Sequence, residues 1–226
     1  MRLLAALLSA SILFAAANDL EQARDRQDKA ALEKLIQGYE AEAQKRNTDA
    51  QAHYRVALAQ SYLAEVALEL REKGLAKSAA EAGIRAAQKA VELNGKSAPN
   101  HCLLGTLCAQ VIPANVLAGL KYGRCAMDEV NKALELDPKS ADAWLRRGVG
   151  NYYLPAQFGG GVDLAIKDFE KSIQLNGKSA EAYLWLGIAL RKANRNAEAR
   201  KALGKAVELN PQRLWAKQQF EKTPVQ

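Results

Sequence analysis

The chain contains few of the side chains from which catalytic and metal sites are built. It has two histidines and three cysteines, and no pair of them has the spacing of metal ligands. It also lacks a Ser-His-acid order, a phosphate-binding glycine loop and a carboxylate pair that stands out from ordinary helical surface. We therefore predict that the protein is not an enzyme and has no catalytic residue, no metal site and no cofactor.

Long apolar runs are absent after the first 17 residues. Residues 3–17 carry no charge, follow Arg2 and end in three alanines, the small residues that a signal peptidase requires. The run is shorter than the roughly 20 residues of a membrane span, and no cysteine for a lipid anchor directly follows it. We expect a signal peptide at residues 1–17 and an exported chain, periplasmic or secreted, that is not an integral membrane protein once processed. An uncleaved N-terminal anchor is the alternative.

Neither sign of charge dominates any segment. The formal net charge is +7, but lysines and arginines are spread among nearly as many acids throughout. This pattern is typical of solvated helix faces rather than of a nucleic-acid footprint. We expect no nucleic-acid partner.

The three cysteines, Cys102, Cys108 and Cys125, fall within one short stretch. Cys102 and Cys108 lie six residues apart on one expected helix, so their side chains diverge and a bridge between them is not expected. Any disulfide should have Cys125 as one end. Three buried cysteines without a bond are the alternative.

One phrase recurs four times. Residues 90–98 read AVELNGKSA, and the phrase returns at 133–141 as ALELDPKSA, at 172–180 as SIQLNGKSA and, in its first half, at 206–211 as AVELNP. Each copy has as its sixth residue a Gly or Pro that can stop a helix. Self-similarity at this spacing predicts a stack of helix pairs.

Aligned on this phrase, the units share columns of similar residues. A ring occupies the first column, at His53, His101, Trp144 and Tyr183. Small residues occupy two columns, Ala57, Gly105, Gly148 and Gly187 in one and Gly83, Ala126, Ala165 and Ala199 in the other. We expect these two columns to face each other, because helices approach closely only where side chains are small. A further column fills the core, with Ala87, Val130, Phe169 and Leu203.

These columns resemble the tetratricopeptide repeat in order and, in the last unit, in its 34-residue length. The resemblance implies an all-α fold, a right-handed superhelix of antiparallel helix pairs. We expect this domain at residues 18–226, with a capping helix at 28–45, repeats at about 50–97, 98–140, 141–179 and 180–213, and a closing helix at 212–220. His53 and His101 are then expected to replace Trp or Tyr in the ring column. Their equivalent positions in neighbouring units leave a shared metal site as a weaker alternative.

The first three units carry extra residues between their paired helices. In the first, we expect one helix from Tyr54 to Lys73, a stop at Gly74, and a capping box opening the next helix at Ser78. In the second, Pro113 should end one helix and residues from Val116 should lengthen its partner. In the third, residues 154–161 should form a loop. Asp163 should cap the next helix, and the Arg147 side chain should reach toward that loop, a contact with a partner being the alternative.

Two further resemblances concern the middle of the chain. Residues 116–138, with Asn100 to Gly105 before them, are similar to the regulator of microtubule dynamics family over roughly residues 88–190. That family associates with microtubules or membrane contact sites in eukaryotes, and with an expected signal peptide only its fold carries over. Pro155, Phe158, Gly159 and Gly160 resemble the inserted loop of periplasmic tetratricopeptide proteins that accompany TRAP-type transporters. Those proteins are typically lipoproteins, whereas this chain lacks their cysteine.

The concave surface of such arrays is lined by the first helix of each pair. Here that surface predicts a mostly apolar groove for a protein or peptide partner, at Tyr54, Leu58, Tyr62, Leu145, Val149, Tyr152, Leu184, Ile188 and Arg191. We therefore expect a non-enzymatic extracytoplasmic binding or scaffold protein. A carrier or sensor of an apolar small molecule or lipid-like ligand is the alternative. A third reading is that these side chains pack against the chain itself.

Overall fold

The computed structural model describes residues 19–114 and 116–225, so the expected signal peptide lies outside the described residues. All regular elements of the described part are helical, which confirms the all-α prediction. No helix among the described residues has both the length and the apolar character that crossing a membrane requires.

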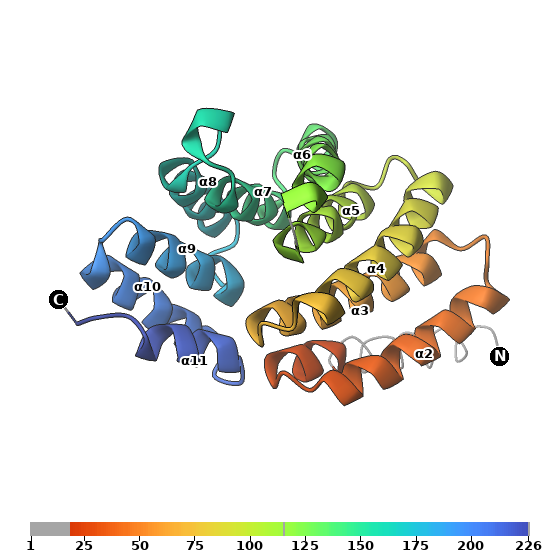
Figure 1. Ribbon diagram of the computed structural model, residues 1–226, viewed down its shortest axis with the longest axis horizontal. Coiled ribbons are helices and arrows are strands. Elements are labelled where there is room, and N and C mark those ends of the chain that lie inside the picture. Colours follow the sequence, from red (N-terminus) through yellow and green to blue (C-terminus); the bar gives the residue numbers. More distant parts are fainter. Residues whose placement is uncertain (1–18, 115, 226) are drawn as a thin grey trace, which may run out of the picture.

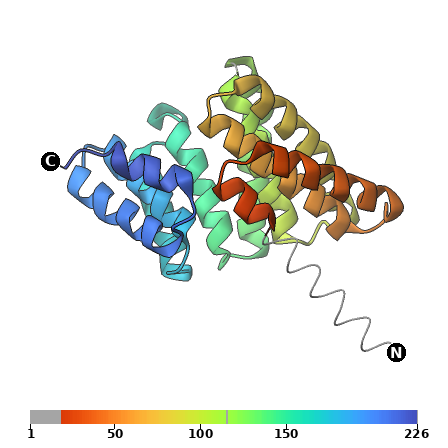
Figure 2. The ribbon, with the colours of Figure 1, turned by 90° about the horizontal axis from the view of Figure 1, so that it is seen from below.

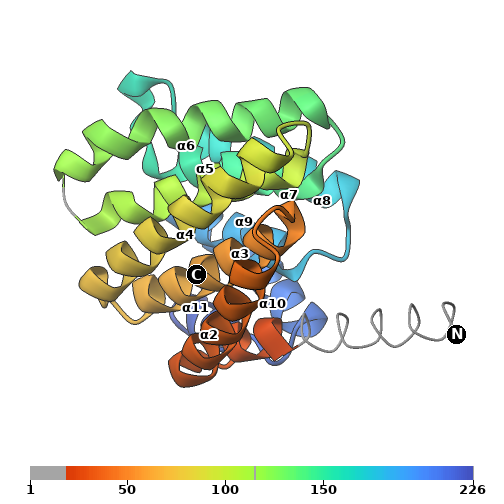
Figure 3. The same ribbon diagram turned by 90° about the vertical axis from the view of Figure 1, so that its right-hand side faces the viewer.

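Four helix pairs follow one another along the chain (Figure 1), each pair within one of the expected repeat ranges. The helix α2 (Lys29–Lys45) precedes them and α11 (Leu214–Glu221) follows. The pairs are α3 (Ala50–Glu69) with α4 (Lys73–Leu93), α5 (Ala98–Val111) with α6 (Val116–Leu136), α7 (Ala141–Tyr153) with α8 (Val162–Leu175), and α9 (Ala180–Lys192) with α10 (Asn196–Leu209). They stack into a curved solenoid (Figures 1 and 3), and the turn between α10 and α11 comes to lie at the end of α3.

The recurring phrase ends one helix and begins the next. Its serine is the N-cap of the following helix at Ser97, Ser140 and Ser179, where the hydroxyl accepts a hydrogen bond from the backbone amide three residues later. Such a cap satisfies one of the amides that a helix start leaves without a partner. The phrase therefore sets both boundaries of the short turn between units.

The rings of the first column also form a hydrogen bond to the preceding turn, which explains why histidine is found in this column. The ring nitrogens Nε2 of His53, Nε2 of His101 and Nε1 of Trp144 each lie 2.9 Å from the backbone carbonyl oxygen six residues earlier, on Asn47, Gly95 and Pro138 respectively. Imidazole thus makes the same bond to the preceding turn as indole does. The expectation that both histidines replace an aromatic ring is confirmed.

The small-residue columns face each other as predicted in the second and fourth units. A Cβ added to Gly105 would lie 3.0 Å from the carbonyl oxygen of Ala126, and one added to Gly187 would lie 3.0 Å from that of Ala199. The filling column is buried in all four units. Close backbone approach and a filled core therefore hold each pair together.

Two of the expected helix boundaries are wrong. The first helix of unit one ends at Glu69, not Lys73, because Arg71 takes a left-handed conformation (φ 64°) and the Glu72 amide donates to the Ala67 carbonyl. The next helix then runs from Lys73 through Gly74 and Ser78.

The other two insertions are closer to expectation. Pro113 lies in a short 3₁₀ turn, η1 (Ile112–Ala114), between α5 and α6. A second turn, η2 (Ala156–Phe158), interrupts the loop at residues 154–161. The N-cap of α8 is Gly161 rather than Asp163, which lies in the first turn of that helix. This connection protrudes from the solenoid (Figure 1).

The core has two large parts that meet between α6 and α7. One cluster of buried apolar residues runs from Leu20 to Ala126, and the other from Leu145 to Ala216. Between them lies only a small cluster, formed by Ala98, Cys102, Ala133 and Ala143. Because these side chains are short, the two halves are joined by little apolar packing at this junction.

Candidate functional site: a cavity between two halves closed by Arg213

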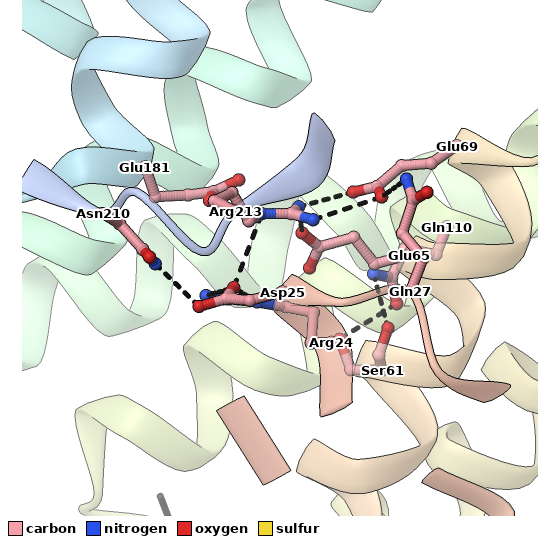
Figure 4. A network of polar contacts seen from close by, with 10 residues as sticks. All are labelled: Arg24, Asp25, Gln27, Ser61, Glu65, Glu69, Gln110, Glu181, Asn210 and Arg213. Carbon is pink, nitrogen blue, oxygen red and sulfur yellow. Dashed lines mark hydrogen bonds and ion pairs between the residues drawn. The ribbon is translucent and has the colours of Figure 1, made fainter. Parts of the chain in front are cut away.

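The two ends of the solenoid are joined by Arg213, in the turn between α10 and α11. Its guanidinium donates to Glu65 at 2.5 Å and to Glu69, both on α3, and forms ion pairs with Asp25 and Glu181 at 3.7 and 3.5 Å (Figure 4). The Arg213 side chain is 1 % exposed. We call this group of five residues the clasp.

Residues near the clasp reinforce it. Asn210 donates to Asp25 at 2.7 Å, and Gln27 donates to Glu69 at 2.8 Å. Residues 19–25, drawn red, lie between α2 and the C-terminal helices (Figure 2). The clasp thus connects segments that are far apart in the sequence and ties the first unit of the solenoid to the last.

Arg213 faces four carboxylates, and a second guanidinium, that of Arg24, forms an ion pair with one of them, Asp25, at 2.7 Å. Burial, together with the neighbouring Glu65, raises the pKa of Glu69 to about 7, although Arg213 opposes the shift. Burial also acts to raise the pKa of Glu181, but Arg213 and Arg24 outweigh it and the net shift is downward. Glu69 therefore takes up a proton near neutral pH.

A cavity of about 530 Å³ lies beside the clasp and between the two halves of the core. We call it the junction cavity. Its walls come from α3, α5, α6, α7, α9 and α11, and its apolar lining is Leu68, Ala109, Pro113, Ala126, Met127, Val130, Val149, Tyr153, Trp185 and Trp215. A volume of this size is within the range of small-molecule sites, about 300–1,000 Å³.

Aromatic rings form one wall of the junction cavity. The ring centroids of Trp185 and Trp215 are 5.3 Å apart, and those of Tyr153 and Trp185 are 6.1 Å apart, all edge-to-face. Trp185 is buried, whereas Tyr153 is 62 % exposed and so reaches the mouth of the cavity. Wide apolar surfaces of this kind bind apolar groups at little cost in side-chain freedom.

A disulfide holds the opposite wall. Cys108 on α5 and Cys125 on α6 are bonded, and the residue after each of them, Ala109 and Ala126, lines the cavity. The expectation that Cys125 forms one end of any bridge is confirmed. Cys102 is free and buried.

Four of the nine residues expected to line an open groove are buried. Tyr62, Leu145, Leu184 and Ile188 are each no more than 8 % exposed. Arg24, next to the clasp, lies with its guanidinium 4.7 Å from the centre of the Tyr62 ring. For these four residues the third reading, packing against the chain itself, is the one that the structure supports.

The other five expected groove residues are partly exposed but do not form one surface. Val149 lines the junction cavity, whereas Tyr54 and Leu58 pack against the N-terminal core cluster. Tyr152 packs against Tyr153, with the Lys192 ammonium 4.2 Å from its ring centre. Arg191 does not meet a partner at the rim, because its guanidinium donates to the Gln219 carbonyl and side chain and to Thr223, holding α11 in place.

Arg147 also differs from expectation. Its guanidinium does not reach the inserted loop. It donates twice to Asp168 on α8, at 3.1 and 2.7 Å, and lies 4.1 Å from the centre of the Trp144 ring. Asn151 donates to the same carboxylate at 2.8 Å. An aspartate in the interior of α8 is the sequence signal that could have indicated this pair.

The sequence reasoning did not identify the tryptophans of the cavity or the clasp. Trp185 and Trp215 are two of only three tryptophans in the chain, which is a weak signal for a shared wall. Among the described residues no group of His, Cys, Asp and Glu has the arrangement of a metal site. What the cavity offers is apolar contact bordered by charge, which suits binding.

Solved structures share this fold at low sequence identity. A thermophilic tetratricopeptide repeat protein of Thermus thermophilus is 18 % identical, with a TM-score of 0.64 over 91 % of this chain and 97 % of that one. The HusA haemophore of Porphyromonas gingivalis is 22 % identical, with a TM-score of 0.55 over 76 % and 93 % of the two chains. No curated protein matches the chain. Proteins of this repeat class generally act as non-enzymatic scaffolds for protein–protein interaction.

The sequence matches two families. Residues 180–213 match the tetratricopeptide repeat. Residues 13–154 match regulator of microtubule dynamics protein 1-3, a range that begins well before the expected residues 88–190 and ends earlier. The match covers more than half of the chain, and the protein therefore belongs to the regulator of microtubule dynamics protein 1-3 family.

Proposed function

We propose that this protein is an exported, non-enzymatic binding protein that recognises a protein partner at the connection between α7 and α8. The observation that carries the proposal is the exposed apolar surface of this connection. Tyr153, Phe158 and Leu164 are 62 %, 68 % and 41 % exposed, and all three belong to the α7–α8 connection or the residues next to it. Large apolar side chains gathered on one protruding segment favour a contact surface.

The experiment is affinity purification from the extracytoplasmic fraction with the full processed chain as bait. Tyr153→Ser combined with Phe158→Ser removes the two exposed aromatic rings of this surface. Leu117→Ser is the matched control, because Leu117 is 73 % exposed on another helix. We expect a partner that the wild type and the control recover and the double variant loses by at least tenfold. Failure to recover any reproducible partner contradicts the proposal.

Export is the other part of the proposal. It is supported by the uncharged residues 3–17 after Arg2, and by a disulfide, which persists in oxidising compartments. Cell fractionation followed by N-terminal sequencing tests it, with a mature chain starting at Asn18 as the expected result. A membrane-bound chain that keeps Met1 would favour the uncleaved anchor, and a cytoplasmic chain would contradict export.

A second function, carrier or sensor of an apolar small molecule, has its own supporting observation. The clasp ties the first unit to the last beside the junction cavity, and this cavity has the volume of a small-molecule site. Native mass spectrometry of freshly purified protein, compared with an organic-extracted sample, tests it. A bound adduct that extraction removes supports the carrier function. An unliganded chain in both samples counts against it.

A further inference from the structure

The charged side chains of the junction cavity are of two kinds, those with an ionic partner and those without. The acids Glu65 and Glu69 both contact Arg213. Arg146 donates to Asp142 at 3.1 Å, and Arg147 to Asp168. These four side chains of the lining are therefore neutralised within the protein.

Three cations of the same lining have no such partner. Arg71, Lys73 and Lys222 line the cavity, are exposed, and form no ion pair among residues 19–114 and 116–225. Arg71 and Lys73 come from the turn between α3 and α4, and Lys222 from the end of α11. The solvent-exposed part of the cavity thus carries positive charge that no carboxylate of the described residues neutralises.

The inner part of the cavity is apolar. Trp185 and Trp215 form its wall together with Met127 and Val149, and Trp185 is only 9 % exposed. An apolar group that binds there is transferred out of water, and this transfer favours binding by about 25 cal/mol for each Å² of apolar surface buried. A single occupant that satisfies both parts needs an apolar body and a negative head.

We infer that the small-molecule occupant of the junction cavity is an amphipathic anion, with its apolar body against Trp185 and Trp215 and its anionic head near Arg71, Lys73 and Lys222. The inference rests on the second function proposed above, and it adds the chemical class of the ligand. A cationic amphiphile is disfavoured because three unpaired cations would repel it. A neutral amphiphile would gain the apolar contact alone.

Isothermal titration calorimetry on the full processed chain distinguishes these cases with three amphiphiles that share one apolar chain. The probes are dodecanoate, dodecan-1-ol and dodecyltrimethylammonium, each below its micelle concentration. We expect dodecanoate to bind at least tenfold more tightly than dodecan-1-ol, and the cation to bind most weakly. High salt should reduce the advantage of dodecanoate.

Two sets of variants locate the effect. Arg71→Gln, Lys73→Gln and Lys222→Gln together should weaken dodecanoate at least tenfold and leave dodecan-1-ol unchanged. The matched control is Lys34→Gln, Lys96→Gln and Lys178→Gln, which removes the same charge from exposed lysines outside the cavity. Gly150→Leu adds a side chain to the lining and should abolish binding of all three probes.

The outcomes separate the inference from the function on which it rests. Equal affinity for dodecanoate and dodecan-1-ol, both blocked by Gly150→Leu, would leave a small-molecule site and overturn the anionic class. Loss of dodecanoate binding in the control triple variant to the same extent would also overturn it. Absence of binding by every probe would count against both, while the protein partner is judged by affinity purification alone.

Discussion

Arg213 donates to Glu69, a residue 144 positions earlier in the chain, and both side chains are almost wholly buried. This contact joins the turn after the fourth helix pair to the end of the first helix of the first pair. A stack of repeats normally makes contacts only between neighbours. Here the first and last units hold each other directly.

Arg213→Leu should destabilise the protein by about 3–5 kcal/mol, because it leaves four carboxylates without their shared cation. Urea denaturation followed by circular dichroism measures the loss. Arg195→Leu is the control, since Arg195 forms an exposed pair with Glu198 on the surface and should change little. Equal midpoints for the two variants would show that the clasp adds no stability.

The stability contributed by Glu69 should fall as pH rises. Its folded-state pKa of about 7 lies above the ordinary value of 4.5, so the folded protein holds this proton more tightly than the unfolded chain does. The contribution is complete below about pH 4.5 and is lost as pH rises through 7, on the order of 3 kcal/mol in all. Thermal unfolding between pH 5 and pH 8 should therefore show a smaller decline for Glu69→Gln than for the wild type. A parallel decline would contradict the raised pKa.

Cys125→Ser should cost about 3 kcal/mol, because the bridge to Cys108 closes a loop with a sequence separation of 17. Guanidinium denaturation with and without dithiothreitol tests this within one set of samples. The reductant should lower the midpoint of the wild type and leave that of Cys125→Ser unchanged. Cys102→Ala, which removes the free thiol, should keep the response to reductant.

Two glycine substitutions should have opposite signs. Gly187→Ala should destabilise by about 1–3 kcal/mol, because the added Cβ would lie 2.4 Å from Cγ of Leu203 and 3.0 Å from the Ala199 carbonyl oxygen. Gly38→Ala should stabilise by about 0.5–1 kcal/mol, since Gly38 is within α2 and its added Cβ would meet nothing within 4 Å. Differential scanning calorimetry of both variants gives the comparison. A gain in stability from Gly187→Ala would contradict the close approach of α9 and α10.

The helix pairs could be predicted from the sequence because their determinants are local. The ring at His101 and the glycine at Gly105 have roles that depend on residues a few positions away or on the partner helix of the same unit. Repetition then supplies further examples of each role. The bond from the ring to the preceding turn recurs at His53, His101 and Trp144, each time to the carbonyl six residues earlier.

The burial of four expected groove residues could not be predicted in this way. Whether Leu184 faces a groove or a core depends on how far the solenoid curves, which is the sum of small rotations between units. The end of α3 is predicted wrongly for a different reason. Glycine adopts the left-handed conformation more readily than arginine, so Gly74 is the expected end of the helix, yet it is Arg71 that adopts this conformation. The burial of the groove residues therefore depends on long-range geometry, and the end of α3 depends on a local backbone conformation that is unfavourable for arginine.

The clasp also constrains how this chain can change in evolution. An open solenoid tolerates the gain or loss of a repeat, because a new unit only lengthens the array. In this protein one more helix pair would carry Arg213 away from Glu65 and Glu69, leaving buried acids without a cation. The Arg213 contacts therefore select against a change in the number of repeats. Changes in length are tolerated better in the connections between paired helices.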